Sequence, residues 1–240
     1  MKQQESALPV NWNEVLLLAL LMALVAFFWS SRPVYPLKVL VTLTHGLSQG
    51  LVASMAGGTM GQAAASSDQG IECAVTGGNQ FAVLVAGYLG CIIWGGAILV
   101  LAAWTHADRV AAGTLGGMLF TTTLLLVRPP ASFAFLVGFF TSAALVLSGA
   151  YLGERFNDYL LRAIGLATCL FPLFDVKRDM LDQVGPKSDA RLLAEHIKIP
   201  VQVSGIFWGG IAIAVSVYLL VAACRKREKE KKADPSAKKK

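Results

Sequence analysis

Charged side chains are scarce in this sequence and are absent from long parts of it. Asp, Glu, Lys and Arg make up 15% of the 240 residues, against about 25% in ordinary soluble domains. The uncharged stretches are residues 39–67, 73–107, 110–127, 129–153 and 199–223. Each reaches or exceeds the roughly 18 residues that mark a membrane-spanning helix. None has the regular polar face of a soluble helix, so the sequence predicts an integral membrane protein.

A basic segment is missing in front of the first apolar run, residues 15–29. Lys2 is offset by Glu5 and Glu14, and no small-x-small cleavage site follows Trp29. A cleaved signal peptide needs both features. We therefore expect an uncleaved first span.

The sequence also lacks any Cys-x-x-Cys pair, which excludes a zinc ribbon and a redox dithiol. The cysteines are Cys73, Cys91, Cys169 and Cys224. Cys91 and Cys169 lie in apolar runs, where cysteine packs as a small hydrophobic residue.

Hydrophobic residues make up 55% of the chain. Their distribution predicts three parts: a polar N-terminus (1–14), one transmembrane domain (15–223) and a basic tail (225–240). Predicted spans cover residues 15–30, 39–56, 81–104, 110–127, 131–152 and 201–223. Because the basic tail directly follows an apolar span, we expect it in the cytoplasm, where it can attract anionic lipid. A nucleic-acid partner is not expected.

A further apolar segment, 159–174, contains Arg162, and its charge-free part is short enough for a re-entrant or a tilted segment. It decides between six and seven spans. The distribution of Lys and Arg between loops favours seven, with the N-terminus outside.

The predicted fold is an all-α polytopic bundle of six or seven transmembrane helices with a small β-hairpin at the membrane surface. The hairpin falls in the loop 57–80, with strands at 59–65 and 71–75 joined by turn-forming residues; a flexible loop is the alternative. The polar loop 175–200 contains a predicted short helix, 188–195, capped by Ser188.

Polar residues within the second span are the first candidates for function. His45 and Gln49 are four residues apart and share a helix face. The simplest interpretation is that they form hydrogen bonds between helices, which are common in membrane bundles. A small transporter or channel is another hypothesis for this sequence. No intramembrane charge pair is evident, which argues against it.

The run from Thr44 to Ala53, followed by Gly57-Gly58, resembles the zinc-binding helix of site-2-protease-like membrane metallopeptidases, in their bacterial B-type branch. That branch also carries segments similar to Gly77-Gly78, to Ala86-Gly87-Tyr88-Leu89-Gly90, to Phe174-Asp175 with Asp179, and to Ser188-Asp189-Ala190 continuing to Pro200. The similarity covers roughly residues 35–215, and the order and spacing of these segments carry it.

The resemblance implies a zinc site, but the motif is degenerate. The family's H-E-x-x-H motif supplies two zinc ligands and a glutamate that activates water. Here His45 is present, Gly46 replaces the glutamate and Gln49 replaces the second histidine. Gly46 cannot accept a proton, and an amide is a poor zinc ligand. His106 and His196 have no spacing that would make either a replacement ligand.

The family's third ligand is an acidic residue that matches Asp175 or Asp179. In the seven-span arrangement Asp175 and His45 would face opposite sides of the membrane. Either the segment 159–174 does not cross, or the aspartate is not a ligand.

These observations predict a pseudoprotease that keeps the fold, needs no cofactor and binds a transmembrane helix of another protein. The groove left by the active site would be lined by Thr44, Ser48, Gly87 and Tyr88. The alternative is an active peptidase that holds zinc through His45, Gln49 and either Asp175 or Asp179, with Asp179 or Glu195 as the base.

Overall fold

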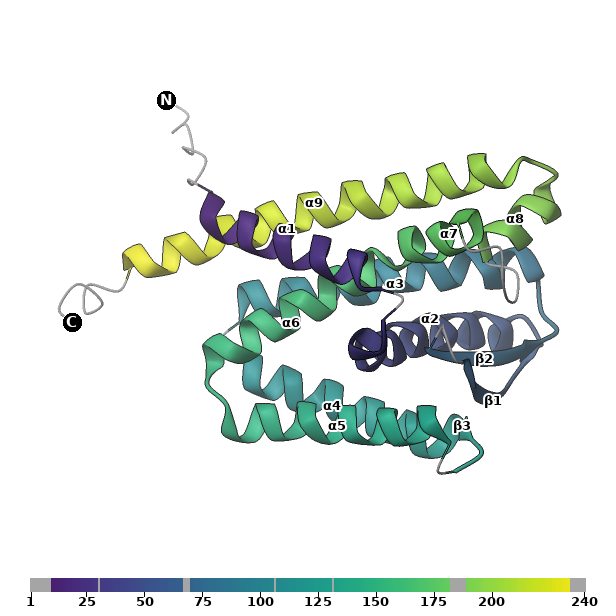
Figure 1. Ribbon diagram of the computed structural model, residues 1–240, viewed down its shortest axis with the longest axis horizontal. Coiled ribbons are helices and arrows are strands. Elements are labelled where there is room, and N and C mark those ends of the chain that lie inside the picture. Colours follow the sequence, from purple (N-terminus) through teal and green to yellow (C-terminus); the bar gives the residue numbers. More distant parts are fainter. Residues whose placement is uncertain are drawn as a thin grey trace.

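A computed structural model describes residues 10–29, 31–66, 70–105, 107–130, 132–181 and 189–233, without the side chains of 64–66, 72, 178–181 and 225–233. The helices are α1 (Trp12–Phe27), α2 (Tyr35–Met55), α3 (Gln80–Trp104), α4 (Asp108–Leu126), α5 (Phe133–Tyr151), α6 (Glu154–Cys169), α7 (Phe171–Leu181), α8 (Asp189–Ile197) and α9 (Val201–Ala233), with a 3-10 turn, η1, at Arg32–Val34. The strands are β1 (Thr59–Ser66), β2 (Gly70–Thr76) and β3 (Val127–Arg128). Most helices run along the long axis of the molecule (Figure 1).

The described helices have the length and composition of membrane spans. Four qualify alone: α3, α4, α5 and the Val201–Cys224 part of α9. Two bent pairs also qualify, α1 with α2 at 119° and α6 with α7 at 50°, which gives up to six spans. The prediction of a polytopic helical bundle is confirmed.

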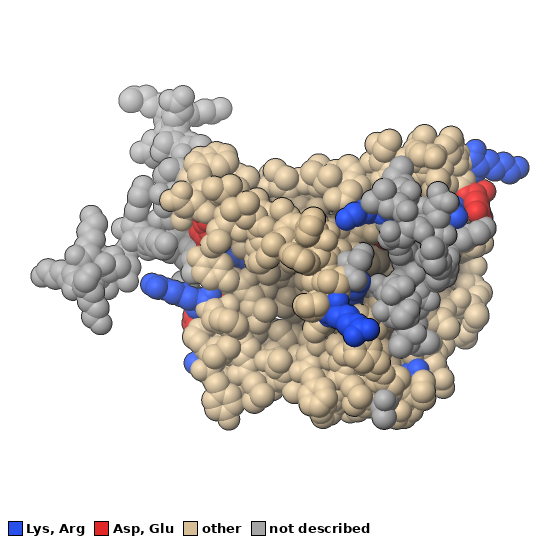
Figure 2. Space-filling model, viewed as in Figure 1, with Lys and Arg blue, Asp and Glu red and all other residues tan. Residues whose placement is uncertain are grey.

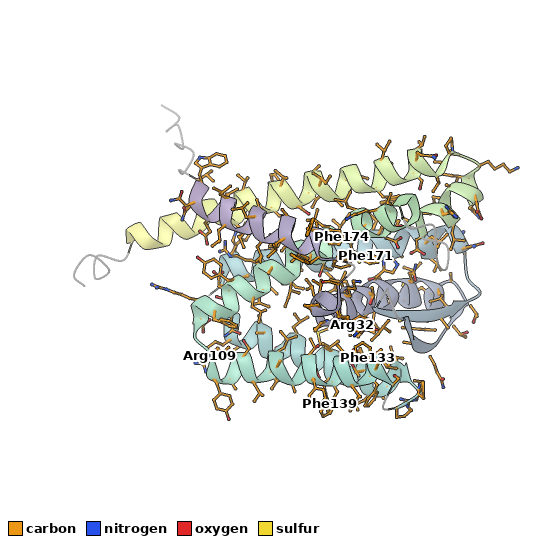
Figure 3. The ribbon with its side chains drawn as sticks, in the orientation of Figure 1. Arg32, Arg109, Phe133, Phe139, Phe171 and Phe174 are labelled. Carbon is orange, nitrogen blue, oxygen red and sulfur yellow. The ribbon has the colours of Figure 1, made fainter. Side chains whose placement is uncertain are left out.

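The described helices give at most six membrane crossings. Helix α1 begins, and α9 ends, at the same end of the bundle, whereas α2 begins near its middle (Figure 1). The break between α1 and α2 contains Arg32, which lies near the middle of the bundle (Figure 3). Hydropathy marks the two apolar segments separately, and the 119° bend between them makes them either one broken span or a re-entrant pair. The described helices therefore give no seventh crossing.

The predicted hairpin is confirmed, and it lies along α2. The Ile71 amide donates to Thr42 Oγ1 at 2.9 Å, and the Tyr35 hydroxyl donates to the Gly70 carbonyl at 3.2 Å. At the other end of the helix, a Cβ on Gly78 would lie 3.3 Å from Ala53. A third strand, β3, pairs in parallel with β1 and was not predicted, because only two residues form it.

The short helix predicted in the polar loop is present as α8, shifted by about one residue at its start. Its predicted cap, Ser188, lies outside the described residues. The last span continues without a break into the basic tail as far as Ala233, so the predicted boundary at 225 does not end the helix.

Small residues let α3 approach its neighbours closely and place it at the centre of the bundle. A Cβ on Gly90 would overlap the Ser48 side chain of α2, and one on Gly95 would lie 2.5 Å from the Gly165 carbonyl of α6. Helix α3 therefore forms one wall of the region around His45.

Charged groups are few on the surface but occur inside the bundle. Figure 2 shows Lys, Arg, Asp and Glu in small groups on a face that is otherwise free of them. Within the bundle, Arg162 is 1% exposed. Its Nε lies 2.8 Å from Asp158 Oδ1, and its Nη1 lies 3.4 Å from Glu14 Oε1 of α1. The expectation that the membrane region holds no charge pair was wrong, because Asp158 and Arg162 pair one turn apart on α6 and α1 brings Glu14 to them.

Candidate functional site

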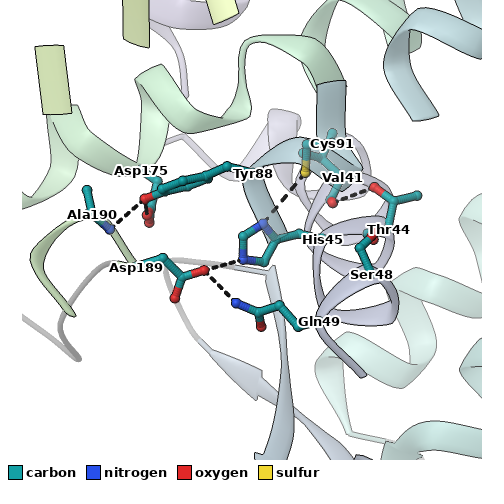
Figure 4. Close-up of polar contacts among 10 residues, drawn as sticks. All are labelled: Val41, Thr44, His45, Ser48, Gln49, Tyr88, Cys91, Asp175, Asp189 and Ala190. Atoms are coloured by element: carbon teal, nitrogen blue, oxygen red, sulfur yellow. Dashed lines mark hydrogen bonds and ion pairs between the residues drawn. The ribbon is translucent and has the colours of Figure 1, made fainter. Parts of the chain in front are cut away.

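The two polar residues of α2 converge on one carboxylate (Figure 4). His45 Nε2 lies 2.7 Å from Asp189 Oδ2, and the Gln49 amide donates to the same oxygen at 2.6 Å. Asp189 is the first residue of α8. The side chains of His45 and Asp189 are 12% and 16% exposed, so this group of three residues is accessible only at its margin. It ties α8 to α2.

Gly87 of α3 makes room for this group. A Cβ at position 87 would lie 2.7 Å from His45 Nε2 and 3.0 Å from the Gln49 amide nitrogen. Real Cβ atoms do not occupy such positions without displacing their neighbours. The absence of a side chain at Gly87 therefore allows the imidazole and the amide to reach Asp189 together.

Tyr88, the next residue of α3, connects the two segments that follow α6. It is fully buried. Its hydroxyl donates to Asp175 Oδ2 of α7 at 2.5 Å and accepts from the Ala190 amide of α8 at 2.8 Å. Its ring packs on Trp208 at 5.4 Å. Tyr88 thus combines a packing contact with a polar link between α3, α7 and α8.

Cys91 lies behind the imidazole, with Sγ 3.6 Å from His45 Nδ1. The order Cys91, His45, Asp189 is that of nucleophile, base and orienting carboxylate in thiol catalysis. However, Cys91 is 0% exposed, whereas reactive cysteines are partly exposed. We therefore assign Cys91 a packing role.

Gly46, at the position where the resemblance expects a glutamate, faces the hairpin. A Cβ on Gly46 would lie 2.8 Å from Cys73 Cβ of β2 and closer still to its Sγ. One helical turn further, a Cβ on Gly50 would lie 2.8 Å from Met60 Cγ of β1. The hairpin therefore fills the space into which a side chain at position 46 would extend.

The described residues do not fit a catalytic zinc site. Such a site takes three protein ligands, with His and carboxylate atoms each about 2.0–2.2 Å from the metal, so that two ligand atoms lie about 3.3 Å apart. Here His45 and Asp189 are in direct hydrogen-bond contact at 2.7 Å. Among the side chains that the structure describes, no three from His, Cys, Asp and Glu are grouped so that they could hold a metal.

The residues predicted as zinc ligands, His45 and Asp175, have different hydrogen-bond partners. Asp175 meets Tyr88, and the carboxylate that His45 contacts is Asp189. The side chain of Asp179 lies outside the described part, as does His106. His196 stacks on Phe81 with ring centroids 6.1 Å apart.

Asp175 and His45 nevertheless lie in the same half of the bundle, since both neighbour Tyr88. The His45 and Tyr88 rings are 5.8 Å apart, and the Tyr88 hydroxyl reaches Asp175. The opposite placement that follows from seven spans does not occur, because α2 and α7 are the second halves of their bent pairs and run toward the same end (Figure 1).

The four residues predicted to line a groove do not form one surface. Gly87 and Tyr88 are buried against His45. Thr44 donates to Val41 O at 2.7 Å and lines a different space, between α2, α3 and α4. Ser48 donates to Thr44 O at 2.9 Å.

Asp189 and Cys73 are the site residues that sequence reasoning missed. Asp189 lies in the segment Ser188-Asp189-Ala190 that resembles the peptidase family, and it could have been considered there as a partner of His45. Nothing in the sequence pairs Cys73 with Gly46, because that contact depends on how the hairpin lies on α2.

One protein family matches most of the chain. The family model described as peptidase M50B-like matches residues 17–223, which include α2, the hairpin, α3, α7 and α8. No curated protein and no solved structure matches the chain significantly. The chain therefore belongs to the peptidase M50B-like family of site-2-protease-like membrane proteins.

Proposed function

We propose that this chain is a pseudoprotease: a site-2-protease-like membrane protein that does not hydrolyse peptides and acts by binding a transmembrane helix of a partner. The observation that carries the proposal is the contact between Gly46 and Cys73. The position that would activate water has no side chain, and its space is filled by the hairpin.

Metal-dependent hydrolysis relies on two groups, and the chain has no side chain at the position of one of them. Metal-dependent hydrolysis needs a bound metal and a group that takes the proton from water. Gly46 supplies no such group. His45 and Gln49 bind Asp189 of the same chain, which supports a structural role for this pair in joining α2 to α8.

The proposed partner is an apolar helix, because the surroundings of the site are membrane-spanning helices. Binding needs shape and a few polar groups but no nucleophile. With the tail in the cytoplasm, Arg109 and Arg155 share its side, as the positive-inside rule expects. The group around His45 then lies toward the opposite side of the membrane. No resident cofactor and no nucleic-acid partner belong to this proposal.

A second candidate, an active peptidase with unusual ligands, is favoured by one observation. His45 and Asp189 bring an imidazole and a carboxylate together, and both are zinc-ligand types. A third ligand and a base would have to come from other groups.

The first test compares zinc content and peptidase activity. We expect wild type and His45→Ala, purified in detergent, to contain equal and substoichiometric zinc. Neither should cleave a model transmembrane substrate with added zinc. One zinc per chain that is lost in His45→Ala, together with zinc-dependent cleavage, would replace the proposal with the second candidate.

The second test measures binding. A labelled single-span peptide titrated into the protein in nanodiscs should bind saturably and stay intact. Gly87→Leu, which displaces His45 and Gln49, should weaken binding, whereas Gly153→Ala, which has open space around it, should not. Equal binding by all three proteins would remove the site from the proposal.

A further inference from the structure

A crevice opens between α2, α3 and α4, on a different side of α2 from Asp189. It contains about 410 Å³ of empty space, part of which is open to the surroundings. Four of its lining side chains form a buried floor, between 2% and 7% exposed: Leu40, Leu43, Ile98 and Leu119. Trp94 and Met118, 40% and 44% exposed, stand at its rim. Thr44, Leu47, Leu115 and Thr122 complete the lining.

The lining presents hydrocarbon and no polar atoms to the crevice. Its two hydroxyl groups are used within their own helices. Thr44 donates to Val41 O at 2.7 Å, and Thr122 donates to Met118 O at 2.8 Å. A ligand with charged or hydrogen-bonding groups would lose its water there without gaining a partner. The crevice is thus complementary in polarity to a saturated hydrocarbon.

The size of the crevice excludes a whole helix. Its lining on α2 runs from Leu40 to Leu47, which is about 10 Å at 1.5 Å per residue. A helix segment of that length, about 10 Å across, fills roughly 800 Å³, which is more than the crevice holds even when its open part is counted. A single extended chain fits this length and this space.

The crevice is also placed where such a chain is at hand. It lies between membrane-spanning helices. Of the four single spans, α4 is the least buried, with 22% of its most apolar 18 residues buried. A void left empty at this depth would deprive its lining of contacts. Hydrocarbon from the bilayer supplies those contacts.

We propose that this crevice binds one acyl chain of a bilayer lipid. The chain lies against the floor formed by α2, α3 and α4, beneath Trp94 and Met118. Binding there is independent of the pseudoprotease proposal, because none of the lining residues belongs to the group formed by His45, Gln49 and Asp189.

Trp94 provides the measurement. A phosphatidylcholine with brominated acyl chains quenches tryptophan on contact, and subtracting the signal of Trp94→Phe isolates Trp94 from the other tryptophans. Titrated into the detergent-solubilised protein, this lipid should quench Trp94 saturably, at about one lipid per chain.

Two variants separate the crevice from ordinary lipid contact. Leu115→Phe fills the crevice and should abolish the saturable part of the quenching. Leu125→Phe changes a residue of α4 that is 67% exposed and outside the lining, and it should leave the quenching unchanged. Quenching that rises without saturation, or that is equal in the two variants, would overturn the proposal. So would shielding of Trp94 by a second polypeptide that copurifies in one-to-one ratio, since the crevice would then be a protein interface.

Discussion

Gly46 shows how a single position can be fixed by an element distant in sequence. It lies on the face of α2 that receives β2, and Cys73 fills the space beside it. His45, one residue earlier, points to another side, toward α3 and α8 (Figure 4). His45 and Gly46, two adjacent positions of α2, therefore serve different contacts.

We predict that Gly46→Ala destabilises the protein, although alanine is the better helix former. Overpacking against Cys73 costs about 1–3 kcal/mol, which outweighs a gain of up to about 1 kcal/mol in helix propensity. Unfolding in detergent, followed by circular dichroism, measures the difference.

The matched control is Gly117→Ala on α4, where nothing lies within 4 Å of the added Cβ, and it should be neutral or stabilising. Adding Cys73→Gly to Gly46→Ala should recover stability beyond the sum of the single changes, since neighbours couple. Equal effects of Gly46→Ala and Gly117→Ala would contradict the proposed contact.

We also predict slow alkylation of Cys73. Burial raises the pKa of this thiol from 9.0 to about 11. At pH 8 its thiolate fraction is then about 100-fold lower than that of a thiol with the unshifted pKa, and the thiolate is the reactive form. The rate of iodoacetamide labelling, taken as wild type minus Cys73→Ser, should rise about tenfold per pH unit until about pH 11.

The same shift has a defined sign for stability. Folding favours the neutral thiol of Cys73. Its contribution to the free energy of unfolding is complete below the unfolded pKa of about 9 and is lost as pH rises through the folded pKa of about 11. A labelling midpoint near pH 9 would show that Cys73 is not buried against α2.

Only part of this site could be predicted at the residue level. The spacing of His45 and Gln49 places them on one helix face, and the structure confirms that they act together. Their shared acceptor could not be derived, because Asp189 is 140 residues or more away and helical periodicity contains no information on that pairing.

Among the elements, α1 has few buried side chains with which to contact the rest of the bundle. Much of it is apolar and exposed, with Leu18 and Met22 as its buried apolar residues. In a membrane, apolar surface alone gives little preference for helix over lipid. The ion pair between Glu14 and Arg162 therefore gives α1 a specific partner in α6.

We predict that Arg162→Leu costs about 3–5 kcal/mol, because removing one member of a buried ion cluster leaves the others without their counter-charge. Thermal unfolding in detergent is the measurement. Arg155→Leu, at an exposed position of the same helix, should stay within about 0.5 kcal/mol of wild type. Similar losses in both variants would show that the cluster contributes little.

Most helices and the hairpin could be predicted from the sequence, but the bends between paired helices could not. Apolar runs and turn-forming residues located the spans, the hairpin and α8, because length and composition determine these. The 119° bend between α1 and α2 depends on which neighbours each half meets, and hydropathy gives the length of a segment without its direction.

For the whole molecule, the arrangement of spans makes a topological prediction. If each bent pair crosses once, the chain crosses six times, and both termini lie on the same side of the membrane. Protease protection of tags at the two ends, in sealed vesicles, tests this directly. We expect both tags to be protected or both to be cleaved.

Cleavage of one tag and protection of the other would require an odd number of crossings. Arg109 lies at the end of the bundle where α1 begins and α9 ends (Figure 3), so a label at its loop should behave like the tags. That position serves as the internal control for vesicle orientation.

The packing of Cys73 on Gly46 also restricts how the chain could evolve. A change of Gly46 to glutamate alone would displace the hairpin, and a loss of the Cys73 side chain alone would leave a gap beside α2. Each first step lowers stability before any chemistry is gained, and Gln49 would still need replacement. For mutation acting one position at a time, the acquisition of a glutamate at position 46 would therefore pass through less stable intermediates.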